Sequence, residues 1–160
     1  MSFFDYPSDG ETVGSEAQVE QDFLSEASEV DWSLLLAHAG RRRFHHGENV
    51  LEPGDAERAF YLVLEGTLEA IQPLRHGRQR RLATIPAGNV IGELSFFDGR
   101  GGSVLVRAST DGELARLGVE DLDALTRARP DLAVAVLFDL GRIVARRLRD
   151  AESPATVTQG

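Results

Sequence analysis

Short runs rich in β-branched and aromatic residues recur through the middle of the chain. Turn residues, such as those of Pro53-Gly54-Asp55 and Glu65-Gly66, separate the runs. Strands of this length and spacing are typical of a β-sandwich, jelly roll or barrel. Helical patterns do not alternate with the runs, which disfavours a doubly wound parallel sheet. The expected strands are Asn49–Leu51, Ala59–Leu64, Thr67–Gln72, Arg80–Ile85, Val90–Ile91, Val104–Ser109 and Glu113–Leu117.

Helical patterns precede the strand-rich segment. Ser15-Glu-Ala-Gln18 has the pattern of a capping box at the start of a short helix. We expect Asp31 to cap a second helix that runs from Trp32 to about Ala39. The run Arg41-Arg42-Arg43 would end that helix, because cations suit the negative end of the helix dipole.

Helical patterns also follow the strand-rich segment. A helix over Glu120–Ala128 is expected to stop before Pro130. A longer amphipathic helix then runs from Asp131 to about Asp150. Its apolar residues Leu137, Leu140, Val144 and Leu148 form one stripe, which we expect to pack in the core or in a dimer, and a lid role would use the same residues.

The order of these elements predicts one mainly β domain with flanking helices. A length of 160 residues suits a single hydrophobic core. The expected divisions are an acidic disordered arm over 1–14, N-terminal helices over 15–40, a β-roll over 41–118, C-terminal helices over 119–151 and a tail over 152–160.

The net charge of −9 is concentrated at the N-terminus. Residues 1–31 contain nine acidic side chains and no basic one, so the remainder carries 17 acids against 17 arginines. A neutral body with an acidic arm is a poor platform for a phosphate backbone, and no helix-turn-helix pattern follows the last apolar segment. We therefore expect no direct DNA binding.

Composition and motif content also exclude several kinds of functional site. The chain has no cysteine, and its four histidines show no metal-ligand spacing, so no metal site is expected. No nucleophile–base pair or phosphate-binding lysine loop is present, so neither an enzyme nor a resident cofactor is expected. No apolar run is long enough to cross a membrane and no secretion signal opens the chain, so we expect a cytoplasmic protein.

Several short motifs together resemble the cyclic nucleotide-binding domain family, which includes the bacterial catabolite activator proteins and the kinase A regulatory subunits. The resemblance covers roughly Trp32 to Asp150. It implies a β-roll (jelly roll) with N-terminal helices and C-terminal lid helices, as in a bacterial sensor. The motifs are Gly47-Glu48, Pro53-Gly54-Asp55, Leu64-Glu65-Gly66, Gly88-x-x-Ile-Gly-Glu-Leu-Ser95, Val106-Arg-Ala108 and Leu117-x-x-Glu-Asp-Leu122.

The resemblance implies a ligand site for cyclic AMP or cyclic GMP. In such domains the stretch matching Gly92–Phe96 forms a one-turn helix whose backbone N–H groups face the cyclic phosphate. The family's acidic residue, here Glu93, accepts a hydrogen bond from the ribose 2′-OH. The last helix acts as a lid whose movement reports occupancy. The expected ligand-binding residues are Ile91, Gly92, Glu93, Leu94, Ser95, Arg100, Gly102, Ser103 and Val104.

The sequence departs from the family pattern in the loop after this helix. Gly102 stands where the phosphate-binding arginine usually lies, while Ser103 matches the small residue that follows it. Arg100 lies two positions early, in a glycine-rich loop, and is a candidate substitute. Glu57 stands where the family often has a small residue.

Two functions follow as hypotheses. In the first, the chain is a stand-alone sensor that binds a cyclic nucleotide and signals to a partner protein through the acidic arm or the last helix, with a homodimer as a further option. In the second, the ligand site has degenerated and the domain is a ligand-independent protein-interaction module. The glycine at position 102 motivates the second hypothesis.

Overall fold

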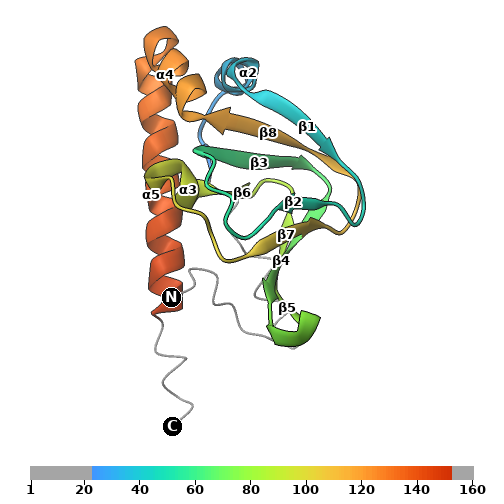
Figure 1. Ribbon diagram of the computed structural model, residues 1–160. Coiled ribbons are helices and arrows are strands. Elements are labelled where there is room, and N and C mark those ends of the chain that lie inside the picture. Colours follow the sequence, from blue (N-terminus) through green and yellow to red (C-terminus); the bar gives the residue numbers. More distant parts are fainter. Residues whose placement is uncertain (1–22, 153–160) are drawn as a thin grey trace.

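The computed structural model describes residues 23–152, in which a roll of antiparallel strands is covered on one side by helices (Figure 1). The predicted mainly β fold with flanking helices is confirmed. The expected arm over 1–14, the helix starting at Ser15 and the tail after Glu152 lie outside the described residues. The strands are β1 Gly40–Phe44, β2 Asn49–Leu51, β3 Ala59–Glu65, β4 Thr67–Pro73, β5 Gln79–Pro86, β6 Val90–Ile91, β7 Leu105–Ala108 and β8 Gly112–Gly118.

The strands form two four-stranded sheets, with the order β1-β8-β3-β6 in one and β2-β7-β4-β5 in the other. Every pair is antiparallel, and β4 and β5 form a long hairpin closed by a short 3₁₀ turn at Arg75–Gly77. Gly66 turns the chain from β3 to β4 with φ = 86°, and a Cβ there would lie 2.4 Å from the Asp111 carbonyl oxygen. Only glycine fits that turn.

The run Arg41-Arg42-Arg43 belongs to strand β1, so the prediction that it ends the first helix is wrong. The strand pairs with β8 from Gly40↔Arg116 to Phe44↔Gly112. Phe44 is buried inside the roll, which anchors the strand although most of its side chains are exposed. Tertiary pairing therefore overrides the polar composition of this segment.

Helix α2 (Glu29–His38) begins one turn earlier than predicted. Ser28, not Asp31, is its N-cap: the Ser28 hydroxyl accepts a hydrogen bond from the Asp31 backbone N–H. The Asp31 carboxylate accepts in return from the Ser28 N–H, which completes a capping box. Asp31 is therefore the third residue of the helix, and Ser28, three positions earlier, is the first residue of the capping box.

Three further helices follow within and after the roll. The short helix α3 (Glu93–Asp98) lies between the roll and the long helix α5 (Pro130–Ala151), which runs along the roll, and α4 (Val119–Ala128) packs against α5 (Figure 1). Of the stripe expected on α5, only Leu140 is fully buried and Leu137 is 40% exposed, so the stripe as a whole does not pack in the core of its own domain. The face toward the roll instead consists of Leu132, Ala133, Val136, Leu140, Ile143 and Arg147.

Strand β3 separates two hydrophobic clusters, which explains its run of consecutive apolar residues. Phe60 and Leu62 face the cluster beneath the helices, whereas Tyr61 and Val63 face the interior of the roll. Successive side chains of a strand point to opposite sides, so a strand buried on both faces needs apolar residues throughout.

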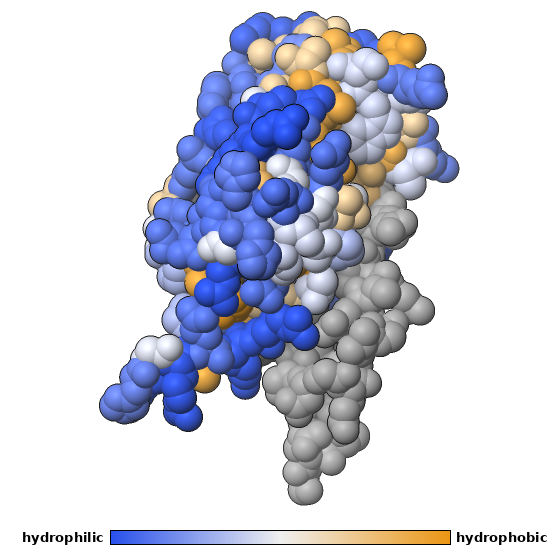
Figure 2. All heavy atoms as spheres, turned by 90° about the vertical axis from the view of Figure 1, so that its right-hand side faces the viewer, coloured by the Kyte–Doolittle hydropathy of each residue, from blue (hydrophilic) through white to orange (hydrophobic). Residues whose placement is uncertain are grey.

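The side of the roll opposite α5 is mainly hydrophilic, with hydrophobic residues only in separated patches (Figure 2). This side carries the β4–β5 hairpin, whose exposed arginines are Arg75, Arg78, Arg80 and Arg81. Among residues 23–152, no helix combines the length and hydropathy that crossing a lipid bilayer requires.

Candidate functional site

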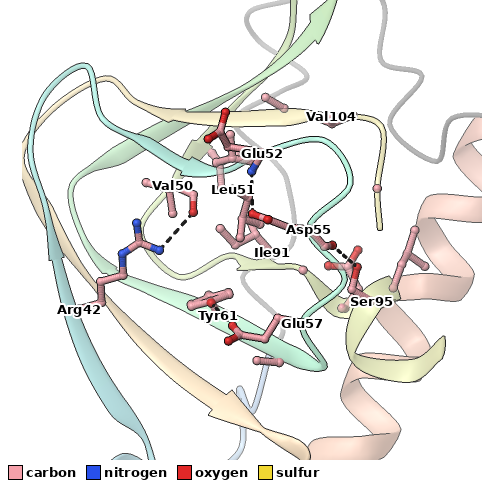
Figure 3. A pocket seen from close by; sticks show the side chains of 18 residues that line it. Arg42, Val50, Leu51, Glu52, Asp55, Glu57, Tyr61, Ile91, Ser95 and Val104 are labelled. Carbon is pink, nitrogen blue, oxygen red and sulfur yellow. Dashed lines mark hydrogen bonds between the residues drawn. The ribbon is translucent and has the colours of Figure 1, made fainter. Parts of the chain in front are cut away.

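A cavity of about 320 Å³ opens between the interior of the roll and helix α3. Its apolar floor comes from Val50, Leu51, Ala70, Ile85, Val104 and Val106. Its polar side chains, several of which Figure 3 labels, are Arg42, Glu52, Asp55, Glu57, Tyr61, Glu93 and Ser95. The cavity therefore offers an apolar surface together with a polar rim, the usual composition of a small-molecule site.

Helix α3 is fixed at both ends. Gly92 starts it with φ = 78°, and a Cβ at this position would lie 3.2 Å from the Ala59 carbonyl oxygen. At the other end Arg58 donates hydrogen bonds to the carbonyl oxygens of Phe96 and Phe97, each at 3.0 Å. These carbonyls carry the partial negative charge of the helix end, which a guanidinium satisfies. Arg58 is thus a positioning residue for α3.

Glu93, the first residue of α3, is almost completely buried and is joined to α5. Its Oε1 accepts a hydrogen bond from Arg147 Nη1 at 2.6 Å, and both side chains are at most 7% exposed. Arg147 also donates from Nη2 to the Val90 carbonyl oxygen at 3.0 Å. Within the described part of the chain, Glu93 Oε2 has no hydrogen-bond partner. One oxygen of this buried carboxylate therefore has unused hydrogen-bonding capacity.

The loop after α3 is held down at the rim of the cavity. The Ser95 hydroxyl lies 2.6 Å from the Arg100 carbonyl oxygen. It also lies 3.4 Å from the Asp55 carbonyl oxygen (Figure 3). The Gly54 N–H donates to the Gly102 carbonyl oxygen at 2.8 Å. A Cβ on Gly101 would lie 2.5 Å from the backbone of Gly54, so the two loops touch directly.

Glu57 and Tyr61 lie together on one wall of the cavity (Figure 3). The Tyr61 hydroxyl donates to Glu57 Oε1 at 2.6 Å, and Arg116 Nε donates to the same oxygen at 3.3 Å. The hydrogen bond from Arg116, followed by that from Tyr61, holds the pKa of Glu57 below its ordinary value. Burial, followed by the bond to Glu57, raises the pKa of Tyr61 to about 12. The pair is thus a carboxylate beside a neutral phenol.

Arg42 is the one basic side chain among the described residues that line the cavity. Its guanidinium already donates to the Val50 carbonyl oxygen at 3.1 Å and to Glu48 Oε2 at 3.0 Å. Four carboxylates, those of Glu52, Asp55, Glu57 and Glu93, line the same space. The cavity is therefore richer in negative than in positive charge.

Most of the predicted site residues meet in the cavity. Ile91, Gly92, Glu93, Leu94, Ser95, Gly102 and Val104 line it. Arg100 and Ser103 are exposed and lie outside the cavity lining. A Cβ placed on Gly102 would meet no atom within 4 Å, so the position has room for a side chain.

Three residues that form or support the site are absent from the expected ligand-binding residues, namely Tyr61, Arg58 and Arg147. A signal for Arg147 was available: it continues the buried spacing Val136, Leu140, Ile143, where a charged residue requires a buried partner.

The described residues contain no group of three or more His, Asp or Glu side chains arranged to hold a metal ion. The adjacent His45 and His46 are exposed, and the His46 backbone N–H donates to Asp111 Oδ1 at 2.8 Å.

Comparisons with known proteins agree with this geometry. The chain is 36% identical over 124 residues to the cyclic AMP receptor protein of Thermus thermophilus, a match that covers 78% of this chain and 55% of that protein. It is 32% identical over 127 residues to the CRP-like protein Clp of Xanthomonas campestris, with 76% of this chain and 54% of that protein covered. The chain thus spans about half the length of these curated relatives.

A solved structure shows the same fold. The crystal structure of the Thermus thermophilus catabolite activator protein superposes with a TM-score of 0.74 at 30% identity, covering 88% of this chain and 63% of that one. The family model described as the cyclic nucleotide-binding domain matches residues 41–129. This chain therefore belongs to the cyclic nucleotide-binding domain family.

Proposed function

We propose that the chain is a non-enzymatic cytoplasmic sensor in which a cyclic nucleotide occupies the cavity and α5 passes the signal to a partner protein. One observation carries the proposal: Glu93 lines the cavity, keeps one buried oxygen without a partner among the described residues, and is bonded through the other to α5. A buried acceptor that lacks a hydrogen bond costs about 1–3 kcal/mol, and a ribose hydroxyl would remove that cost.

The phosphate would lie at the start of α3. There the backbone N–H groups after Gly92 lack partners within the helix, as the first N–H groups of any helix do. The family match supports this placement, and the close approach of backbone at Gly92 fits it. Ser103 and Arg100 are the remaining candidates for phosphate contacts, and both would have to turn toward the cavity from the exposed loop.

The glycine at position 102 weakens phosphate binding in this proposal. A charge-assisted bidentate contact contributes about 2–5 kcal/mol when its partner is buried. Without it, affinity for a cyclic nucleotide falls by a factor of roughly 30 to several thousand. The sensor would then respond only at high ligand concentration, unless Arg100 supplies the missing charge.

The signal would leave through the outward face of α5. Val134, Leu137 and Phe138 are 51%, 40% and 71% exposed, and Val144 and Leu148 continue the same face. Val134, Leu137, Gly141, Val144 and Leu148 recur at the alternating three- and four-residue spacing of a two-stranded helical seam. We infer a homodimer in which α5 pairs with its copy.

A partner protein completes the proposal. The partner would contact the dimer or the acidic stretch over residues 1–31. Direct contact with DNA by the described residues is not part of the proposal, because their charge is close to balanced.

Calorimetric titration of the full chain with cyclic AMP and cyclic GMP, up to millimolar concentration, tests the proposal. Saturable heat is expected, together with an affinity about tenfold or more lower in Glu93→Gln, because a hydrogen bond to a charged group is lost. The far-UV spectrum of each variant checks its fold. Absence of heat with either nucleotide, in a folded wild-type protein, would reject the sensor and favour a ligand-independent interaction module.

A further inference from the structure

The β4–β5 hairpin concentrates positive charge on the surface of the roll. Its exposed basic residues, which we call the hairpin arginines, are Arg75, Arg78, Arg80 and Arg81. The two strands and their turn, residues 67–86, contain one acidic residue, Glu69. Glu69 Oε1 already lies 3.5 Å from Arg107 Nε on the neighbouring strand β7. The hairpin therefore has no acidic side chain left to neutralise its own arginines.

The hairpin arginines also find no carboxylate elsewhere in the described residues. None of them forms an ion pair with an acidic side chain of residues 23–152, and Arg80 donates at 2.6 Å to the uncharged side chain of Gln72. By contrast, Arg127, which is exposed on α4, pairs with Asp123 at 2.6 Å. Like charges gathered without counter-charges repel one another, so this surface favours the approach of a polyanion.

The hairpin is open to such a partner. Strand β5 is the edge of its sheet, so one side pairs with β4 and the other meets no strand among the described residues. The hairpin also projects away from α5 and from the rest of the roll (Figure 1). An extended chain of opposite charge can therefore lie along it.

The chain itself contains a segment of the opposite charge. Residues 1–22 precede the described residues and contain no basic side chain. Their six acidic residues are Asp5, Asp9, Glu11, Glu16, Glu20 and Asp22. This segment starts from a fixed point, because Phe23 is 4% exposed and its ring centroid lies 6.1 and 6.0 Å from those of Trp32 and Phe60. The same chain thus supplies a complementary occupant.

The acidic segment is long enough to reach the hairpin. An extended chain spans about 3.3 Å per residue, so residues 1–22 can reach as far as about 70 Å from Phe23. A compact domain of about 130 residues has a radius of gyration of about 14 Å. Attachment within one chain also gives an effective concentration in the millimolar range, so several weak ion pairs suffice for binding.

We propose that residues 1–22 bind the hairpin arginines of the same chain through ion pairs. The bound segment neutralises the hairpin and keeps other polyanions away from it. It also withdraws the acidic stretch from a partner protein, which would have to displace the segment from the hairpin. The contact does not require a nucleotide in the cavity.

A spin label in the acidic segment tests this contact directly. The chain has no cysteine, so Ser8→Cys gives the full chain a single attachment site for a nitroxide. At about 10 mM salt, the NMR signals of the backbone amides of residues 75–81 are expected to lose about half or more of their intensity, relative to the reduced label. At about 1 M salt, where screening confines charge interactions to roughly 3 Å, the intensity should return.

Two sets of substitutions assign the contact to the hairpin arginines. Changing all four of them to glutamine should abolish the loss of intensity at low salt. The matched control changes four exposed arginines outside the hairpin to glutamine and should leave that loss in place. The control positions are Arg41, Arg43, Arg127 and Arg149. The far-UV spectrum of each variant checks its fold.

Three results would overturn the proposal. The first is full intensity at low salt, or a loss that survives removal of the hairpin arginines. The second comes from mixing isotopically labelled chains without the nitroxide and unlabelled chains that carry it: loss of hairpin signals there would assign the contact to a second copy. The third is a single-stranded oligonucleotide that shifts the hairpin signals when the nitroxide does not affect them, because the surface would then be a nucleic-acid site.

Discussion

Arg147 of α5 donates a hydrogen bond of 2.6 Å to Glu93, the residue that begins α3. The two residues are 54 positions apart, and both are buried. A pair of buried charges is stable only while both members are present, because each alone would be an uncompensated charge in a medium of low dielectric. Any ligand that competes for Glu93 therefore acts on α5 as well.

Replacing Arg147 by leucine is expected to destabilise the fold strongly. The change leaves the Glu93 carboxylate buried without its cation, which costs about 3–5 kcal/mol. The midpoint of urea unfolding, with an unchanged slope, measures the loss.

Two further variants test whether this loss of stability comes from breaking the Glu93–Arg147 ion pair. Arg149→Leu, at an exposed position on the last turn of the same helix, should change stability by no more than about 0.5 kcal/mol. The double variant Glu93→Leu with Arg147→Leu should recover much of the loss, because an apolar pair replaces the ion pair. A single Arg147→Leu variant as stable as the wild type would show that the pair contributes little.

Introducing arginine at position 102 is expected to raise the affinity for cyclic nucleotides by about 30-fold or more, since it restores a bidentate phosphate contact. Gly102 lines the cavity and has open space where a Cβ would lie, so the backbone need not move. Calorimetric titration measures the change.

Ala87→Arg is the control for added positive charge, because Ala87 is exposed on the turn between β5 and β6 and lies outside the cavity lining. It should leave the affinity unchanged. A Gly102→Arg protein that gains no affinity would place the phosphate elsewhere in the cavity.

Stability is expected to fall between pH 10 and 12 because of Tyr61. The pKa of this residue is raised to about 12 in the folded chain, chiefly by burial, whereas an unfolded tyrosine titrates near its ordinary value of 10. In this window the unfolded state has released a proton that the folded state keeps, so rising pH favours unfolding. The loss should reach about 2 kcal/mol.

Urea unfolding at a series of pH values checks this dependence. Tyr61→Phe has no proton to lose at this position, so its stability should decline less over the same window. If the wild type and Tyr61→Phe follow parallel curves between pH 10 and 12, Tyr61 titrates normally in the folded protein.

A charge on the outward face of α5 is expected to separate the proposed dimer. Phe138 is 71% exposed and takes no part in the core of its own roll. Phe138→Glu should therefore yield a monomer in sedimentation equilibrium with little change in the melting temperature of the domain. Glu120→Gln, at an exposed residue of α4, is the control. A wild type that is monomeric at high micromolar concentration would contradict the α5 seam.

The roll was predictable because several of its turns and strands carry local signals. Gly66 marks the turn that only glycine fits, and Gly92 marks the start of α3. Strand β1 was missed because only its pairing with β8 and the burial of Phe44 define it, and neither leaves a pattern in the polar run Arg41–Arg43.

The residues that line the cavity were predictable where the family motif is local and not where they depend on packing. Gly92, Glu93 and Ser95 are consecutive or nearly so, and the structure brings them to one cavity. The partner of Glu93 comes from a helix 54 residues away, and the sequence pattern of α5 selected a different stripe from the one that packs. Which face of an amphipathic helix is buried depends on the surface it meets, since both faces of α5 contain apolar residues.

Hydrogen exchange of the backbone amides, with and without saturating cyclic nucleotide, tests the central claim most directly. Ligand in the wild-type cavity should change the exchange of α3 and also of α5 around Arg147, and Arg147→Leu should confine the change to α3 and the cavity wall. A ligand that binds the wild type and alters α3 while leaving α5 unchanged would contradict the coupling through Glu93 and Arg147.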